Sequence, residues 1–294
     1  MLELAGITKS YGDHRVLDRV SFGVVPGRLT GFVGGNGAGK TTTMRIVLGV
    51  LSRDEGEVTL HGAPVTAADR RHFGYMPEER GLYPKMRVLD HIVYLARLHG
   101  FGRTEAERRA RAPLAQLGLG ERLNDKVETP SLGNQQRAQI AAARMADPRL
   151  LILDEPFSGL DPIALDVVAG VLQARAARGA AVLFSSHQLD VVERLCDHLV
   201  IISGGTIRAA GSTDRLRDRH AQRRFELVAT TDTGWVRSRP GVRVIEADGG
   251  RVRFDADDEP AAQGVLRRAV ELGGVTSFAP VRPALAEIFR EVVQ

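Results

Sequence analysis

The sequence predicts an α/β fold with a parallel sheet at its centre, interrupted by a helical segment and followed by a small α+β domain. Three observations carry this prediction. Residues 1–86 alternate short β-like runs with glycine-containing turns. Residues 87–147 have helical periodicity, and the alternation of strands and helices resumes from Leu150. Because such alternation favours a parallel sheet covered on both faces, we interpret the helical segment as an insertion in an α/β domain.

The elements expected in the α/β domain follow from its apolar runs and helical periods. The runs predicted as strands are residues 2–7, 20–25, 29–33, 57–60, 72–76, 150–153, 181–184 and 198–202. The segments predicted as helices are residues 103–117, 131–146, 163–178 and 188–196, with another helix in the periodic segment around Val88 to Ala96.

The character of the chain changes near Thr213, so we expect two domains, residues 1–215 and residues 216–294. The second has a split β-α-β pattern, which predicts a small α+β domain without a recognisable chemical motif. Its expected strands are residues 225–229, 242–246, 251–254 and 275–279, and its expected helices are residues 259–272 and 283–293.

Composition narrows the class of protein. No run approaches the ~20 apolar residues that a membrane-spanning helix needs, and residues 1–5 lack the basic lead and apolar core of a secretory signal. Cys196 is the only cysteine, so no intramolecular disulfide can form. Such cysteine usage is typical of a reducing cytoplasm. The net charge is +4 and the basic residues are mixed with acids, so we expect a cytoplasmic protein with no nucleic-acid partner.

A glycine-rich motif lies between the predicted strand at 29–33 and an apolar, helix-capable segment at 42–50. It fits the pattern G-x-x-x-x-G-K-[ST] without a gap. The residues are Gly34, Gly35, Asn36, Gly37, Ala38, Gly39, Lys40 and Thr41. The glycines let backbone N–H groups curl around a β-phosphate at a helix N-terminus. We expect Lys40 to reach the β- and γ-phosphates of ATP and the Thr41 hydroxyl to ligate Mg²⁺, with Thr42 in the same site.

Two carboxylates end the apolar run at residues 150–153. Burying carboxylates there is costly unless they serve a cation or a proton. We therefore expect Asp154 to hold Mg²⁺ and Glu155 to polarise the attacking water as general base. His187 follows the apolar run at 181–184. Because parallel strands deliver their carboxyl ends to one edge of a sheet, we expect His187 to sense the γ-phosphate there and orient the water.

The segment Ser131-Leu132-Gly133-Asn134-Gln135-Gln136-Arg137 resembles the signature motif of ATP-binding cassette (ABC) ATPases. With Ser158-Gly159-Leu160-Asp161 and Ser186-His187, the order of motifs is similar to that family over residues 2–215. The resemblance implies a P-loop NTPase of ABC type, with a parallel sheet core, an antiparallel β subdomain and an inserted helical subdomain at about residues 87–147. It also implies that Tyr11 stacks on adenine and that Asp161 belongs to the nucleotide site.

The signature segment has a physical case of its own. Ser131 suits the N-cap of a helix, with helix-forming residues behind it. Its hydroxyl, the Gly133 N–H and the helix dipole make an anion site that lacks an anion of its own. The resemblance implies two cassettes packed head to tail, so that each ATP lies between one chain's phosphate loop and the other chain's signature.

The chain departs from the family pattern at three places. The usual Leu-Ser-Gly-Gly-Gln is Pro130-Ser131-Leu132-Gly133-Asn134, and Gly35 stands where the phosphate loop usually has proline. Glu78 stands where the family usually has a glutamine near Mg²⁺, and a carboxylate binds Mg²⁺ more strongly but repels the γ-phosphate. The segment from Arg80 to Met86 and the C-terminal domain resemble exporter ATPases grouped with sodium and drug efflux systems.

The resemblance implies the ATP-hydrolysing, energy-coupling subunit of an ABC transporter, with exporters the closer match. We expect a homodimer that acts on a separate transmembrane permease, placing the chain on the inner face of the cell membrane. The alternative is a soluble ABC ATPase acting on ribosomes or nucleic acid. Relatives of that kind usually carry two cassettes or a long coiled coil, and this sequence has one cassette and no sustained heptads. A module that binds ATP without turnover is opposed by Glu155 and His187.

Overall fold

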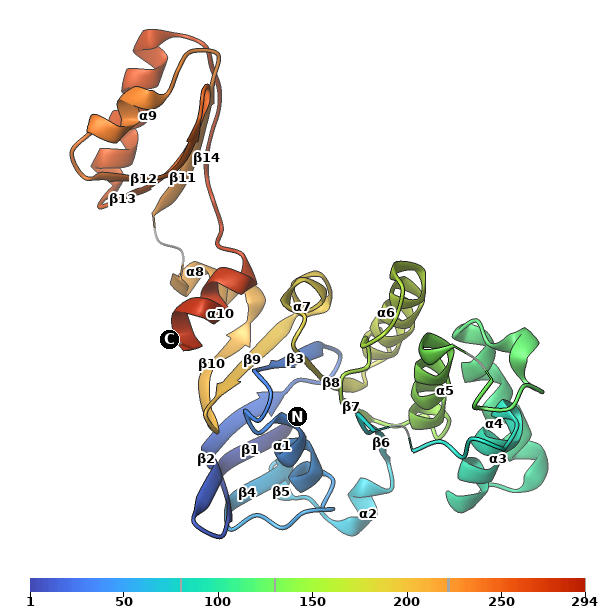
Figure 1. The fold of residues 1–294 in the computed structure, drawn as a ribbon. Coiled ribbons are helices and arrows are strands. Elements are labelled where there is room, and N and C mark those ends of the chain that lie inside the picture. The colour runs from blue at the N-terminus through green and yellow to red at the C-terminus, as the bar shows by residue number, and fades with distance from the viewer. Residues whose placement is uncertain (80, 130, 221–222, 294) are drawn as a thin grey trace. The chain divides into compact units, whose positions relative to one another are not determined.

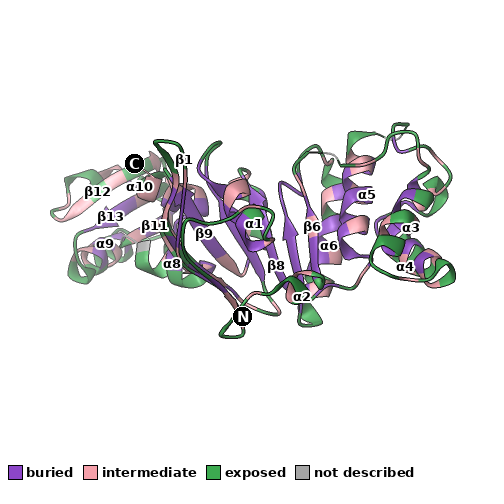
Figure 2. Cartoon of the chain, turned by 90° about the horizontal axis from the view of Figure 1, so that it is seen from below, coloured by how far each residue is buried: buried purple, intermediate pink, exposed green. Residues whose placement is uncertain are grey.

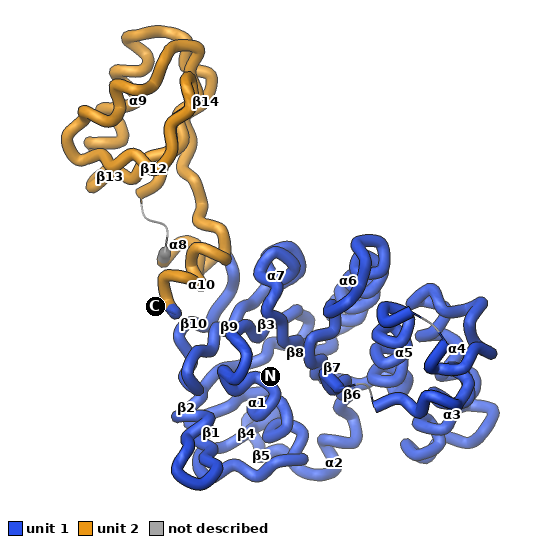
Figure 3. Tube along the Cα trace, viewed as in Figure 1, with its two compact units in different colours: residues 1–213, 293 blue, residues 214–292, 294 orange. Residues whose placement is uncertain are grey.

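The computed structural model describes residues 1–79, 81–129, 131–220 and 223–293 (Figure 1). Arg80 and Pro130, which belong to two of the motifs above, lie outside the described residues. The chain divides into two compact units (Figure 3), here called unit 1, Met1–Thr213, and unit 2, Asp214–Val292. The boundary suggested by the sequence, after residue 215, falls inside helix α8 (Thr213–His220).

A six-stranded sheet forms the centre of unit 1, with the order β10-β9-β3-β8-β7-β6. Its strands are β3 (Leu29–Val33), β6 (Phe73–Met76), β7 (Leu150–Leu153), β8 (Ala181–Ser186), β9 (His198–Ser203) and β10 (Thr206–Ser212). Strands β6, β7, β8, β3 and β9 are parallel, whereas β10 returns antiparallel beside β9. Strand β10 was not expected from the sequence, because its partly exposed residues do not form an apolar run.

A second sheet in unit 1 is antiparallel and four-stranded, with the order β2-β1-β4-β5. Its strands are β1 (Leu2–Tyr11), β2 (His14–Val24), β4 (Glu55–Leu60) and β5 (Ala63–Pro64). Both sheets contribute to one hydrophobic core, in which the rings of Phe22 from β2 and Phe32 from β3 lie 5.1 Å apart. Complete burial of a side chain such as Phe32 contributes about 1.5–3 kcal/mol to folding.

The helices of unit 1 are α1 (Lys40–Val47), α2 (Ala67–Arg70), α3 (Val88–Leu98), α4 (Arg103–Gln116), η1 (Gly120–Arg122), α5 (Leu132–Arg144), α6 (Pro162–Ala177) and α7 (Leu189–Leu195). Helices α3, α4 and α5 pack against one another and form the inserted helical region. Figure 2 shows the strands of the central sheet buried, while α3 and α4 turn exposed faces outward. These two sheets and the helical insertion confirm the predicted fold class.

Unit 2 contains a four-stranded antiparallel sheet with the order β12-β13-β11-β14. Its elements are α8, β11 (Arg224–Ala229), η2 (Gly234–Ser238), β12 (Val242–Asp248), β13 (Arg251–Ala256), α9 (Glu259–Leu272), β14 (Val275–Pro280) and α10 (Leu285–Val293). Its core is the stack of Phe225 on Phe254 and Phe278, together with buried side chains of α9 such as Val265. Across the described ranges of both units, no helix has the length and apolar character needed to cross a membrane.

Candidate active site

The glycine-rich loop connects the end of β3 to the start of α1, and three of its glycines are required by the backbone or by packing. Gly37 and Gly39 have φ angles of 75° and 106°, in the left-handed region that glycine adopts without strain. A Cβ at Gly34 would lie 2.4 Å from the Ile202 carbonyl oxygen, so no side chain fits there. Gly35 has open space instead, which agrees with a position where the ABC family usually carries proline.

Lys40 is the first residue of α1, and its ammonium turns back over the loop. The side chain is mostly buried, and Nζ donates hydrogen bonds to the carbonyl oxygens of Gly34 at 2.7 Å and Gly35 at 3.1 Å. Each of these carbonyls is a weaker acceptor than a charged phosphate oxygen. The Lys40 ammonium therefore lies at the N-terminus of α1, and both the ammonium and the helix N-terminus favour binding of an anion there.

Two hydroxyls and one carboxylate meet beside this loop. The Thr41 hydroxyl donates to Asp154 Oδ2 at 2.8 Å, and the Ser185 hydroxyl donates to Asp154 Oδ1 at 2.5 Å. Asp154 is 1% exposed at the end of β7. Mg²⁺ takes oxygen ligands and commonly uses one or two carboxylates together with substrate phosphates. The oxygens of Thr41 and Asp154, next to a phosphate-binding loop, fit that donor set.

Glu155 has an unusual backbone and a fixed environment. Its φ angle is 52°, which is uncommon for a residue other than glycine. Its N–H donates to Ser185 Oγ at 2.8 Å, and its carbonyl accepts from Gln136 Nε2 at 2.8 Å. Its carboxylate lies 3.0 Å from His187 Nδ1, and the His187 side chain is about half exposed. A buried carboxylate next to an accessible imidazole can orient and deprotonate a water molecule.

The signature segment starts α5, with Ser131 at the N-cap position. Ser131 is exposed, and within the described part of the chain its side chain makes no capping hydrogen bond. A Cβ at Gly133 would meet only ordinary contacts, 3.4 Å from Gly159 O and 3.5 Å from Leu160 Cδ2. Packing within one chain therefore does not explain the glycine, whereas close approach of an external group would.

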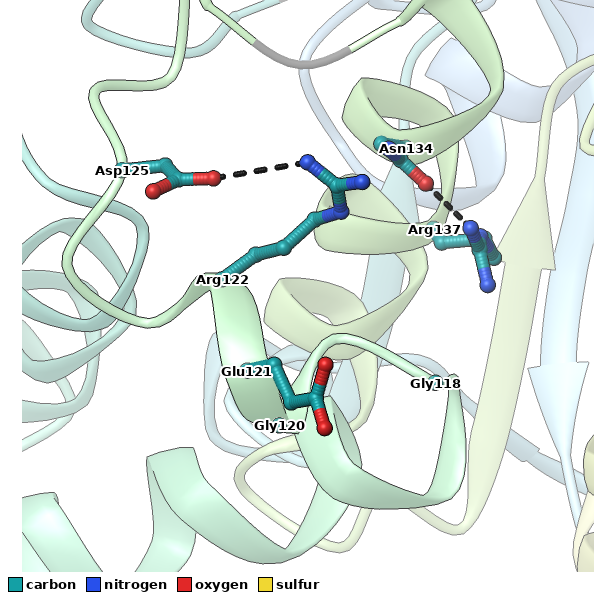
Figure 4. Close-up of a pocket in the computed structure, with 7 residues that line it drawn as sticks. All are labelled: Gly118, Gly120, Glu121, Arg122, Asp125, Asn134 and Arg137. Carbon is teal, nitrogen blue, oxygen red and sulfur yellow. Dashed lines mark hydrogen bonds and ion pairs between the residues drawn. The ribbon is translucent and has the colours of Figure 1, made fainter.

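Asn134 occupies the position at which the family signature usually has glutamine, and it faces inward. Figure 4 shows it in a pocket with Arg137 and the connection between α4 and α5. The Arg137 guanidinium donates to Asn134 Oδ1 and to the Leu117 carbonyl oxygen, the latter at 2.8 Å. Asn134 is 7% exposed, whereas among the residues described at this end of α5 Ser131 and Leu132 are exposed and Gly133 and Gln135 are partly exposed.

The residue expected to stack on adenine lies at the end of β1. Tyr11 is 51% exposed, and Lys9 Nζ lies 5.7 Å from the centre of its ring. Asp54 fixes the preceding residues, because its carboxylate accepts from Lys9 Nζ at 2.6 Å and from the Ser10 N–H at 2.7 Å. An exposed aromatic ring on an anchored strand end suits stacking on a base.

The remaining expected site residues, Asp161, Thr42 and Glu78, differ in their exposure and in their hydrogen bonds. Asp161 is the N-cap of α6, and its Oδ1 accepts the Ala164 N–H at 2.8 Å. Thr42 lies in the first turn of α1 and is partly exposed. Glu78 is exposed after β6, and the described residues show no hydrogen bond or ion pair that would fix its carboxylate at the loop.

The structure thus brings the phosphate loop, Asp154, Glu155 and His187 together at the carboxyl edge of β3, β7 and β8. No role was expected from the sequence for Ser185 or Gln136, although one lies next to a motif described above and the other lies within one. Ser185 directly precedes Ser186-His187, and Gln136 lies within the signature segment. The sequence did contain a signal for each, because Ser185 is a hydrogen-bonding side chain at a strand end and Gln136 is one in the signature helix.

The fold and this site define a P-loop nucleotide-binding protein. Residues 17–158 match the family described as ABC transporter, and residues 211–293 match "ATP-binding protein DrrA1-3-like, C-terminal domain". The chain is 36% identical over 293 residues to "Uncharacterized ABC transporter ATP-binding protein YhaQ" of Bacillus subtilis, covering 100% of this chain and 98% of that protein. It is 31% identical to "Nod factor export ATP-binding protein I" of Rhizobium etli, covering 94% and 81% of the two chains.

A solved structure described as "Structure of ATP binding subunit of ABC transporter" is 33% identical, with a TM-score of 0.68 over 74% of this chain and 92% of that one. The chain belongs to the family of ABC transporter ATP-binding proteins. It is an ATP-binding ATPase of that family.

Proposed function

We propose that this ATPase drives an ABC exporter by closing two copies of the chain around two molecules of MgATP. A separate membrane-spanning permease receives the motion, which places the chain on the inner face of the membrane. The observation that carries the proposal is the presence of two complementary half-sites on one chain. The phosphate loop with Glu155 is one half, and the exposed start of α5 at Ser131 and Gly133 is the other.

Within the first half-site each residue has a definite task. Backbone N–H groups of the loop and Lys40 bind the β- and γ-phosphates. The oxygens of Thr41 and Asp154 hold Mg²⁺, which neutralises charge on the phosphates when bound. Glu155 accepts the proton of the attacking water, and His187 orients that water beside the γ-phosphate. Tyr11 stacks on the adenine ring.

The second half-site serves the partner chain. The Ser131 hydroxyl and the N–H groups at the start of α5 can donate hydrogen bonds to an anion, and the helix dipole favours negative charge at the same place. The γ-phosphate bound by the other chain has the matching charge. We place Thr42 and Asp161 among the further nucleotide contacts and Glu78 beside Mg²⁺, on their position in the motifs rather than on a contact within one chain.

The exporter assignment rests on the similarity to a relative that is named as a Nod factor export protein and that matches 94% of this chain. The identity of the exported compound belongs to the permease and is not assigned.

Complementation between two inactive variants tests the shared site. Lys40→Ala removes one half-site and Ser131→Arg removes the other. In a mixed dimer both lesions fall in the same site, leaving the second site intact, so mixing two inactive proteins should restore ATPase activity. Wild type paired with the double variant should be inactive, because each site then has one damaged half. Heterodimers are verified first by differential tagging. If the first mixture had no ATPase activity and the second were active, each site would be formed within a single chain.

A further inference from the structure

The peptide groups on both sides of Glu155 Cα are held by side chains from different parts of the chain. Ser185 on β8 accepts its N–H, and Gln136 on α5 donates to its carbonyl, each at 2.8 Å. All three residues are buried, with exposed fractions of 8% for Glu155, 0% for Ser185 and 6% for Gln136. Because the φ angle of 52° at Glu155 is disfavoured for a residue with a side chain, these two hydrogen bonds help to determine where its carboxylate points.

Gln136 links this residue to the other half-site. It lies three positions after Gly133 on α5, hence within one helical turn of that partly exposed residue. The same helix therefore contacts the backbone carbonyl of Glu155 in its own chain and, in the function proposed above, faces the partner's nucleotide at its N-terminus. The buried hydrogen bond from Gln136 therefore connects the first turns of α5 to Glu155.

We propose that Gln136 is a positioning residue that holds Glu155 in its active geometry. The proposal rests on the role of Glu155 in the function proposed above. The Gln136 amide fixes the Glu155 carbonyl, so that the carboxylate is aligned for the water that attacks the ATP bound by the same chain.

Gln136→Met tests the hydrogen bond with little change in side-chain volume, because methionine is similarly long and unbranched but has no N–H donor. A base displaced by about 1 Å can slow a reaction about 100-fold. We expect kcat to fall about 10- to 100-fold while KM for ATP changes less than about twofold, since the phosphate loop is untouched. In a Glu155→Gln background the same change should cost nothing further, because the group that it positions is already inactive.

Gln139→Met is the matched control. Gln139 lies almost one turn further along α5 and is equally buried, and its amide donates to the Glu79 carbonyl oxygen at 3.4 Å rather than to Glu155. Its kcat should stay within about twofold of the parent. An equal loss of kcat in both variants would mean that general disturbance of α5 is responsible, and would overturn the proposal.

Mixed dimers locate the effect. In the dimer of Lys40→Ala with Ser131→Arg chains, the working site takes its phosphate loop and Glu155 from the Ser131→Arg chain. Gln136→Met added to that chain should abolish most of the restored activity. Added to the Lys40→Ala chain, which contributes only the signature, it should leave the activity within about twofold. The reverse pattern, or an equal loss in both, overturns the assignment of Gln136. An inactive parent mixture instead refutes the shared site, with the kcat of the Gln136→Met homodimer then testing the positioning role alone.

Discussion

Replacing Glu155 by glutamine should leave ATP bound and slow its hydrolysis by about 10²- to 10⁴-fold, because the group that accepts the proton from water is lost. The structure indicates that this change is local. The N–H and carbonyl of residue 155 are held by Ser185 and Gln136 whatever the side chain is, and glutamine keeps the length of glutamate. The change alters the contact of this side chain with His187 Nδ1, which lies 3.0 Å from the carboxylate.

The loss corresponds to about 2.7–5.4 kcal/mol of transition-state stabilisation, at 1.36 kcal/mol for each tenfold change in rate. Steady-state release of phosphate measures kcat, and size-exclusion chromatography with MgATP measures the closed dimer, which should accumulate. Titration calorimetry checks that ATP still binds. Hydrolysis at the parent rate by a Glu155→Gln protein that remains monomeric would refute the assignment of the base.

Four further predictions concern both units. Lys40→Ala should abolish turnover and weaken ATP binding, since the cation that faces the phosphates is removed; ATPase activity near that of wild type would contradict this. Removal of Mg²⁺ with EDTA should stop phosphate release, and excess Mg²⁺ should restore it. A chain of residues 1–215 should bind ATP within about tenfold of full length, a difference of ~1.4 kcal/mol; a folded fragment without measurable binding would assign part of the site to unit 2. Burial raises the pKa of Asp255, but the hydrogen bonds and charges of Arg224 and Arg243 together lower it by more, so that its pKa lies below the usual 3.8. The resulting stabilisation of unit 2 is present above pH 3.8 and lost as pH falls through the lowered pKa; fluorescence of Trp235, the only tryptophan, should therefore show a smaller acid dependence in Asp255→Asn.

Prediction from the sequence was most successful where a pattern is local. The expected strand at 29–33 is β3, and the helix-capable segment after the loop contains most of α1. Both were predictable because apolar runs and glycines determine the local structure of the residues next to them. Strand β10 escaped prediction because it depends on pairing with β9 rather than on its own composition. Helix α5 begins one residue and ends two residues inside the expected 131–146, within the usual uncertainty of helix ends.

The sequence by itself determined the α/β class, the phosphate loop and the acids at the end of β7, since spacing along the chain carries that chemistry. Only the tertiary structure decided how Glu155, the proposed base, is held. Ser185, 30 positions after Glu155, and Gln136, 19 positions before it, reach the same peptide groups because β7, β8 and α5 converge. Hydrogen bonds act over about 3 Å in space and leave no periodicity in the sequence, so such partners emerge only once the chain is folded.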